Sequence, residues 1–237
     1  MDSTPYDLYL LIGQSNMAGR GELDGAATPP SPRIAMLDKA GAWVPARDPL
    51  HFDKPDMVGV GPGLAFALDM LAADRSAGIG LIPCAVGGTS LSAWQPGARD
   101  EATRTHPYDD TLRRARLALP HGRLRAILWH QGEGDCQRED GWDHAAEMVA
   151  FVERLRSALG AEDVPFIAGE IGVFRDERAA ACRRMNATLH GLVGRIPRYA
   201  CISAEGLADK GDLLHFSAAA ARELGRRYAA GLRRLQA

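Results

Sequence analysis

The sequence has no excess of basic residues and no long apolar run. Its 237 residues include 28 Lys+Arg against 30 Asp+Glu, which gives a formal net charge of −2. This balance argues against nucleic acid or an anionic membrane as the main partner, since both favour a concentrated basic surface. No apolar run approaches the roughly 20 residues that a membrane-spanning helix needs. We therefore expect neither nucleic acid nor a membrane among the partners.

A basic segment is also missing at the N-terminus, where the chain reads MDSTPYDLYLLIG. Acidic residues precede a short apolar stretch here, whereas a secretory signal peptide begins with positive charge. The pattern indicates a first strand and favours a cytoplasmic protein, unless a leader peptide has been removed.

Cysteine is scarce, and no two cysteines form a C-x-x-C pair. The four are Cys84, Cys136, Cys182 and Cys201. Cys84 and Cys201 lie at the ends of apolar runs that look like buried strands. Free, buried thiols in a reducing compartment are therefore expected.

Short apolar runs alternate with helical patterns along the whole chain, whose composition is otherwise ordinary, at 46% hydrophobic and 24% charged residues. Strands are predicted at residues 8–12, 79–83, 124–129, 164–168 and 199–202. Helices are predicted at residues 63–73, 108–119, 142–159, 177–193 and 217–235, the last N-capped by Ser217. Residues 28–32 and 48–62 are predicted to be surface loops.

This alternation of five strands and five helices predicts the fold class. Strands that alternate with helices form a parallel sheet covered by helices on both faces. We therefore predict an α/β fold, a three-layer α/β/α sandwich with a five-stranded, mostly parallel, flavodoxin-like sheet. The length suits one domain, residues 1–237.

Polar, glycine-rich segments follow three of the predicted strands, and another polar segment precedes the last helix. In open parallel sheets ligands bind beyond the carboxyl ends of the strands, so we expect these segments to converge at one edge. Together they contain Ser15, Asp212 and His215. A hydroxyl, an imidazole and a carboxylate are the set that nucleophilic acyl transfer needs. Serine alone is more often a turn residue, but the position of Ser15 directly after a buried strand favours a catalytic role.

Two other motifs have ordinary explanations. Residues 59–63 (GVGPG) do not form G-x-G-x-x-G, and Pro62 lacks the N–H that a phosphate would need, so a tight loop and helix start are favoured over a nucleotide site. His130, Glu133 and Asp135 match no zinc-ligand spacing. We therefore expect no metal, and expect His130 to form hydrogen bonds within its loop.

Five sequence blocks carry a resemblance to a known family. They read LIGQSNMAGRG, GVGPGLAFA, GGTSLSAW, WHQGEGD and DLLHFS, and the match extends from residue 8 to about residue 220. In this order they resemble the SGNH hydrolase superfamily. Within it they look like the sialate O-acetylesterase-like branch, carbohydrate esterase family six, which includes acetylxylan esterase-like proteins. Members of this branch remove acetyl groups from sugars.

The resemblance implies roles for individual residues. Ser15 would be the nucleophile, His215 the general base and then acid, and Asp212 the carboxylate that orients it. The oxyanion hole would consist of the backbone N–H of Ser15, a backbone N–H of the Gly87-Gly88 turn and the side-chain amide of Gln131. Of the two glycines, we select Gly88 as the donor. Preorganised neutral donors of this kind stabilise the charge of a tetrahedral intermediate.

Further residues are assigned with the same motifs. Glu133 is predicted to be a second acid that helps to orient the imidazole, although it could instead only brace its own loop. Gln14, Thr89 and Trp94 are assigned to substrate binding. For Trp94 a wall that stacks against a sugar and a partly buried core position are equally open. The resemblance implies no cofactor.

The function expected from this set is that of a serine esterase that removes O-acetyl groups from a small acetylated carbohydrate through an acyl-enzyme. Two alternatives remain open. One is a short-chain lipid or thioester hydrolase with the same triad, and the other is a catalytically silent carbohydrate-binding protein. The second is disfavoured because Ser15, Gln131, Asp212 and His215 are all present.

Overall fold

A single seven-stranded sheet lies at the centre of the protein, in the order β3-β2-β4-β1-β5-β6-β7. The computed structural model describes residues 6–23, 31–74, 77–138 and 143–236. The strands are β1 (Tyr6–Gly13), β2 (Ile34–Leu37), β3 (Trp43–Pro45), β4 (Gly78–Pro83), β5 (Gly122–His130), β6 (Phe166–Gly169) and β7 (Tyr199–Ile202). The α-helices are α1 (Ser15–Ala18), α2 (Pro62–Ala73), α3 (Pro107–Ala118), α4 (His144–Leu159), α5 (Asp176–His190) and α6 (Ala218–Gln236). All strand pairs are parallel except β2 with β3.

The prediction of five strands was wrong, because β2 and β3 extend the sheet at one edge. They are only four and three residues long. The turn that joins them is closed by the Asp38 N–H, which donates to the Ala42 carbonyl, and by the Ala42 N–H, which donates to the Asp38 carboxylate. Strands this short contain too few residues for an alternating pattern to stand out in the sequence.

The five strands that the sequence predicted are all present, in the spatial order β4-β1-β5-β6-β7. Numbered by their place along the chain, this is the 2-1-3-4-5 order of a flavodoxin-like sheet. The predicted helices are also present with ends shifted by a few residues, although Trp142 lies outside the described residues. The Ser217 Oγ accepts the N–H of Ala220 at 3.2 Å, which confirms the predicted N-cap of α6.

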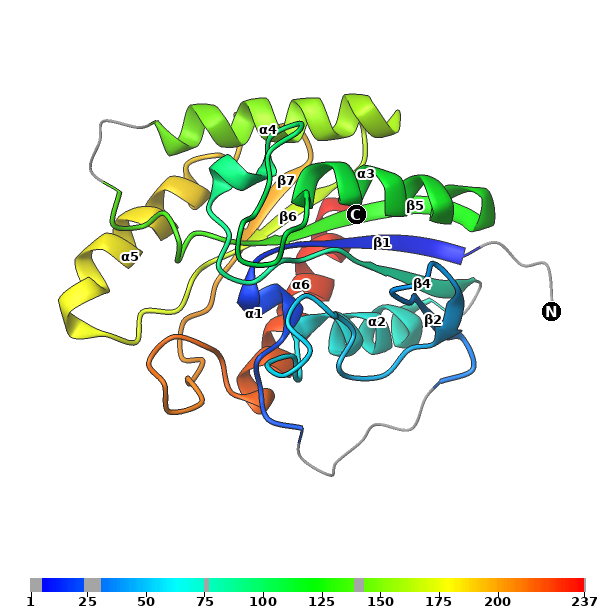
Figure 1. Cartoon of the computed structure of the whole chain (residues 1–237), viewed down its shortest axis with the longest axis horizontal. Helices are drawn as coiled ribbons and strands as arrows, with labels where there is room; N and C mark the ends of the chain where they lie inside the picture. Colours follow the sequence, from blue (N-terminus) through cyan, green and yellow to red (C-terminus); the bar gives the residue numbers. More distant parts are fainter. Residues whose placement is uncertain (1–5, 24–30, 75–76, 139–142, 237) are drawn as a thin grey trace.

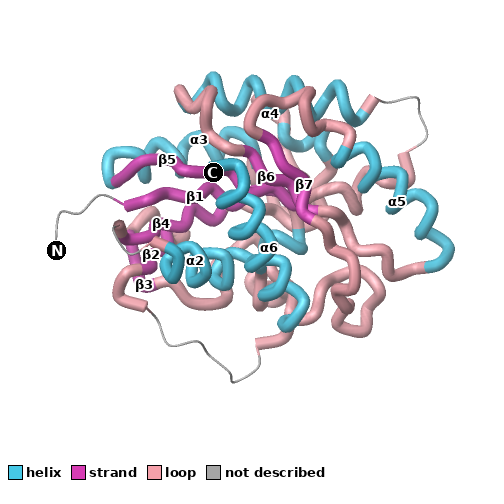
Figure 2. Tube along the Cα trace, turned by 180° about the vertical axis from the view of Figure 1, so that it is seen from behind, coloured by secondary structure: helices cyan, strands magenta, loops and turns pink. Residues whose placement is uncertain are grey.

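Helices cover both faces of the sheet and make three layers (Figure 1). Alternate residues of β1 explain the arrangement, since successive side chains of a strand point to opposite faces. Leu8, Leu10 and Ile12 pack in a core shared with α3, α4 and α5. Tyr9 and Leu11 pack in a second core with α2 and α6. Figure 2 shows α2 and α6 together on that second face.

All four cysteines are free, as predicted; three are buried and Cys201 is half-buried. None of the helices in the described part of the chain is both long and apolar enough to cross a membrane.

Candidate active site

The loop after β1 presents Ser15 at the carboxyl edge of the sheet. Gly13 ends the strand at a φ of +122°, and a Cβ there would lie 2.1 Å from the carbonyl oxygen of His130. Only glycine allows this close approach. The Gln14 N–H donates to that same carbonyl, and α1 begins at the next residue. The sequence thus turns sharply at the end of β1 and places Ser15 beside the ends of the neighbouring strands.

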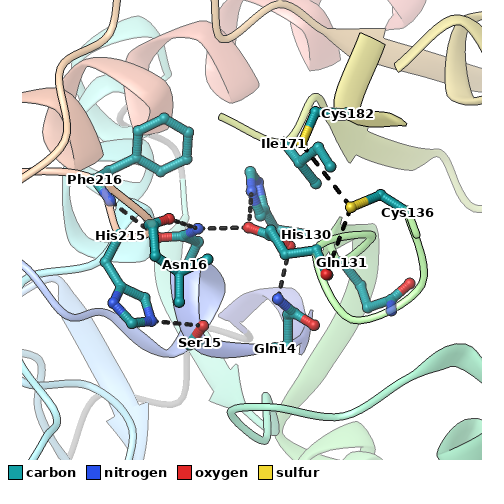
Figure 3. Close-up of polar contacts among 12 residues, drawn as sticks. Gln14, Ser15, Asn16, His130, Gln131, Cys136, Ile171, Cys182, His215 and Phe216 are labelled. Atoms are coloured by element: carbon teal, nitrogen blue, oxygen red, sulfur yellow. Dashed lines mark hydrogen bonds and ion pairs between the residues drawn. The ribbon is translucent and has the colours of Figure 1, made fainter. Parts of the chain in front are cut away.

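Ser15, His215 and Asp212 form a continuous hydrogen-bonded chain. His215 Nε2 lies 3.1 Å from Ser15 Oγ, as drawn in Figure 3, and His215 Nδ1 lies 2.7 Å from Asp212 Oδ2. Since a carboxylate only accepts, Nδ1 must donate to Asp212, which leaves Nε2 of a neutral ring free to accept from the serine. The structure therefore brings together the three residues that the sequence predicted as a triad.

The loop before α6 holds Asp212 as a carboxylate. Its Oδ1 accepts the backbone N–H groups of Leu214 at 3.0 Å and His215 at 2.8 Å. Burial opposes ionisation, but these hydrogen bonds and the one from the imidazole outweigh it and lower the pKa of Asp212 to about 2. Asp212 is therefore charged at every pH at which an imidazole titrates.

An open pocket lies over Ser15 and His215. It is lined by Gln14, Ser15, Arg20, Lys54, Met57, Gly87, Gly88, Glu133, Gly134, Arg178, Leu214 and His215. Gly88, which the sequence predicted as a backbone donor, is among these lining residues. The N–H groups of Ser15 and Gly88 make no hydrogen bond to another backbone group of the described residues. Both remain available to an oxygen placed in the pocket.

Glu133 lies against Asn16, and no hydrogen bond or ion pair joins it to the imidazole of His215, contrary to the prediction of a second orienting acid. Its carboxylate accepts from the side-chain amides of Gln14, at 2.7 Å, and Asn16. Burial raises the pKa of Glu133, but His130 and the Asn16 amide outweigh this and lower it below its usual range. Glu133 is therefore a buried carboxylate whose hydrogen bonds join the loops that follow β1 and β5.

Asn16 is a site residue for which the sequence predicted no role. Its Nδ2 donates to Glu133 and to the Leu214 carbonyl, and its Oδ1 accepts the Phe216 N–H at 3.1 Å. These two backbone groups flank His215, and Figure 3 shows Asn16 between Phe216 and His130. The G-Q-S-N block contained this residue, but no pattern in the sequence indicates a partner 200 positions away.

Gln131 is placed differently from its predicted role as an oxyanion donor. The side chain is fully buried, and its amide nitrogen donates to the Thr89 carbonyl and to the Asp135 carboxylate. It does not line the pocket over Ser15. The same Asp135 carboxylate accepts the Leu91 N–H at 2.7 Å. Gln131 and Asp135 thus brace the loop after β5 against the loop after β4.

All three residues assigned to substrate binding are buried, and two of them, Thr89 and Trp94, do not line the pocket. Trp94, at the end of the 3-10 helix Leu91–Trp94, is fully buried and packs edge-on against Trp129. Its indole N–H donates to Thr89 Oγ1, which itself donates to the Val86 carbonyl. Both side chains are buried and hydrogen-bonded within the protein, so they cannot contact a substrate. Gln14 does border the pocket.

The alternatives raised by the sequence take ordinary forms in the structure. Within the described residues no group of three or more His, Cys, Asp or Glu side chains is placed to hold a metal ion. Residues 59–63 form a tight loop in which Val60 pairs with Gly21, and Gly61 precedes Pro62 at the start of α2.

Comparisons with known proteins agree on one family. The family model described as "carbohydrate esterase, sialic acid-specific acetylesterase" matches residues 5–234. The chain belongs to this family of carbohydrate esterases. It is therefore a hydrolase, as the sequence predicted.

Individual relatives support the same assignment. The probable carbohydrate esterase At4g34215 of Arabidopsis thaliana is 33% identical over 245 residues, which cover 93% of this chain and 88% of the relative. The X-ray structure of the Arabidopsis protein superposes with a TM-score of 0.86 at 30% identity, over 97% of this chain and 98% of the other. The probable 9-O-acetyl-N-acetylneuraminic acid deacetylase of Escherichia coli is 28% identical over 65% of this esterase and 61% of its own length. The crystal structure of NanS shares the fold, with a TM-score of 0.76 at 21% identity over 100% and 99% of the two chains.

Proposed function

We propose that this esterase removes O-acetyl groups from a carbohydrate by a serine mechanism with an acyl-enzyme intermediate. Ser15 is the nucleophile, His215 the general base and then acid, and Asp212 the residue that orients it. The observation that carries the proposal is the chain of hydrogen bonds from Ser15 Oγ through the imidazole to Asp212, at the floor of an open pocket.

The geometry suits each proton transfer of this mechanism. His215 Nε2 takes the proton of Ser15 as Oγ attacks the acetyl carbonyl carbon. The charge that develops on the carbonyl oxygen is stabilised by the N–H groups of Ser15 and Gly88. When the intermediate collapses, the bond between the acetyl carbon and the sugar oxygen breaks, and the imidazolium returns its proton to that oxygen. Water then attacks the carbonyl carbon of the acyl-enzyme while His215 takes its proton. The bond from that carbon to Ser15 Oγ breaks, the imidazolium returns the proton to Oγ, and acetate leaves.

The walls of the pocket favour an acidic sugar. Lys54 and Arg178 both border it, and the Lys54 ammonium lies beside Gly88. A carboxylate on the substrate would be attracted to these cations while its acetyl group lies over Ser15. The E. coli relative is named as a deacetylase of an N-acetylneuraminic acid derivative, which is such a carboxylate sugar. We therefore place O-acetylated acidic sugars first among the candidate substrates.

The proposal is tested with a series of aryl esters and a panel of acetylated sugars. Activity on the esters should fall steeply for acyl chains longer than propionyl, whereas a lipid or thioester hydrolase would prefer longer chains. Acetate release from acetylated sialic acids should exceed that from acetylated xylo-oligosaccharides. Absence of turnover with every substrate would instead indicate a carbohydrate-binding protein.

The substitution Lys54→Met tests whether Lys54 binds the carboxylate of an acidic substrate. The variant should raise the KM for an acetylated sialic acid several-fold and leave the kinetics on a neutral aryl acetate unchanged. Equal effects on both substrates would count against recognition of the carboxylate.

A further inference from the structure

A buried ion pair lies beside the pocket and takes no part in the chemistry described so far. Arg20 Nη2 and Asp53 Oδ2 are 2.7 Å apart, and the two side chains are only 1% and 2% exposed. Arg20 follows the nucleophile loop, residues 13–19, which contains α1 and Ser15, whereas Asp53 belongs to the long loop that precedes α2. Taking two charges out of water is expensive, so a pair this deeply buried calls for a reason beyond stability.

The pair connects the nucleophile loop to the glycine turn after β4. Arg20 Nη1 donates to the Gly19 carbonyl at 2.8 Å. Asp53 Oδ2, besides its bond to Arg20, accepts the backbone N–H of Gly87 at 2.7 Å. A Cβ on Gly87 would lie 2.3 Å from Arg20 Nη2, so the turn approaches the guanidinium as closely as a glycine permits.

The N–H groups of the two residues before Gly88 are both hydrogen-bonded within the protein. The N–H of Val86 donates to the Gly13 carbonyl, and the N–H of Gly87 donates to Asp53. The next N–H, that of Gly88, makes no bond to another backbone group of the described residues. Gly88 has a φ of +87°, a conformation that turns the chain sharply at this point and favours glycine.

We propose that Asp53, held by Arg20, is a positioning residue of the oxyanion hole, which fixes Gly87 so that the N–H of Gly88 is presented to the acetyl carbonyl oxygen. This inference rests on the proposed serine mechanism. Burial raises the pKa of Asp53, but the hydrogen bonds from Arg20 and Gly87 outweigh it and lower the pKa, which keeps the carboxylate charged as an acceptor. A preorganised donor costs no rearrangement when the charge develops, so its fixation affects kcat more than substrate binding.

Two double variants isolate the hydrogen bond from the ion pair. R20M/D53N and R20M/D53L both remove the two charges, so neither leaves a buried charge unpaired. Only the asparagine of the first variant offers an oxygen to the Gly87 N–H. Removal of an oxyanion donor costs roughly 10²–10³ in kcat, and a donor that is displaced but not deleted should cost roughly 10-fold to 10². We expect the kcat of R20M/D53L to be roughly 10-fold to 10² lower than the kcat of R20M/D53N, with KM values within a fewfold.

Amide hydrogen exchange gives a readout that does not depend on turnover. The Gly87 amide should exchange slowly in wild type and R20M/D53N, and fast in R20M/D53L. The control is D7L/R125M, which removes the ion pair between Asp7 and Arg125 (2.6 Å) at the opposite end of β1 and β5. It should leave kcat unchanged. R20M/D53A provides the same comparison if leucine does not fit.

The outcomes are distinguishable. A lower kcat together with fast Gly87 exchange in R20M/D53L supports the inference. An active wild type whose two double variants share one kcat would overturn this inference alone. A wild type without esterase activity would overturn the proposed function, and the positioning role with it.

Discussion

Asn16 connects the segment of Ser15 to the loop of His215, although it is not hydrogen-bonded to the imidazole and does not line the pocket. Its amide oxygen holds the Phe216 N–H, its nitrogen reaches the Leu214 carbonyl, and the buried carboxylate of Glu133 fixes its orientation. Because Leu214 and Phe216 flank His215, the position of the imidazole relative to Ser15 depends on this side chain. Glu133 thus contributes to the histidine through Asn16 and not by direct contact.

Asn16→Ala should therefore lower kcat without preventing folding. A shift of about 1 Å in a catalytic group can cost roughly 10² in rate, and we expect a loss of that order, with KM within a fewfold. Steady-state kinetics on an aryl acetate measure the effect, and thermal unfolding confirms that the variant is folded. A folded variant with the kcat of wild type would show that the loop of His215 holds its position unaided.

The pH dependence should show one ionisation on the acidic side. His215 must be neutral to accept the proton of Ser15, so kcat/KM should rise with pH between 5 and 8. Asp212, with its pKa lowered to about 2, is already a carboxylate throughout this range and adds no second step. A profile that stays flat from pH 5 to 8 would rule out the imidazole as the base.

Among the elements, helices α2 and α6 pack closely together, and Gly225 lies where their backbones meet. A Cβ on Gly225 of α6 would lie 2.3 Å from the Pro62 carbonyl oxygen and 2.9 Å from the Phe66 nitrogen, both backbone atoms of α2. At Gly231, two turns further along α6, a Cβ would instead meet the end of the Ile202 side chain at 2.3 Å. A backbone cannot move aside as a side chain can, so these two glycines should differ in their tolerance of alanine.

Gly225→Ala should destabilise the protein by overpacking, which costs about 1–3 kcal/mol in well-packed cores. Gly231→Ala, in the same helix, is the matched control and should cost clearly less, because Ile202 can change its rotamer. Chemical denaturation of both variants measures the difference in the free energy of unfolding. Equal stabilities would mean that α2 and α6 separate without cost.

The elements also show which parts of the fold could be predicted from the sequence. Strands such as β1 and β5 are apolar runs buried in the sheet, and the following glycines mark their ends clearly. β2 and β3 were missed because their four and three residues add only an edge to the sheet and carry little periodic signal.

At the scale of the whole molecule, the topology explains why the grouping of Ser15, Asp212 and His215 could be predicted. Ser15 follows β1, and parallel strands end at one edge, so the sequence order of the polar loops sufficed to bring them together. The direction of each side chain within those loops was not predictable. Gln131, Thr89 and Trp94 have the same motif context as the triad residues, yet packing between the loops buries all three.

The most direct test of the serine mechanism is acetate release by Ser15→Ala. Loss of a triad nucleophile costs roughly 10⁴–10⁶ in kcat where the residues act as a unit. The account predicts a loss of this size for Ser15→Ala on an acetylated substrate, in a variant that unfolds at the temperature of wild type. A folded Ser15→Ala protein that keeps its kcat within tenfold of wild type would contradict the account.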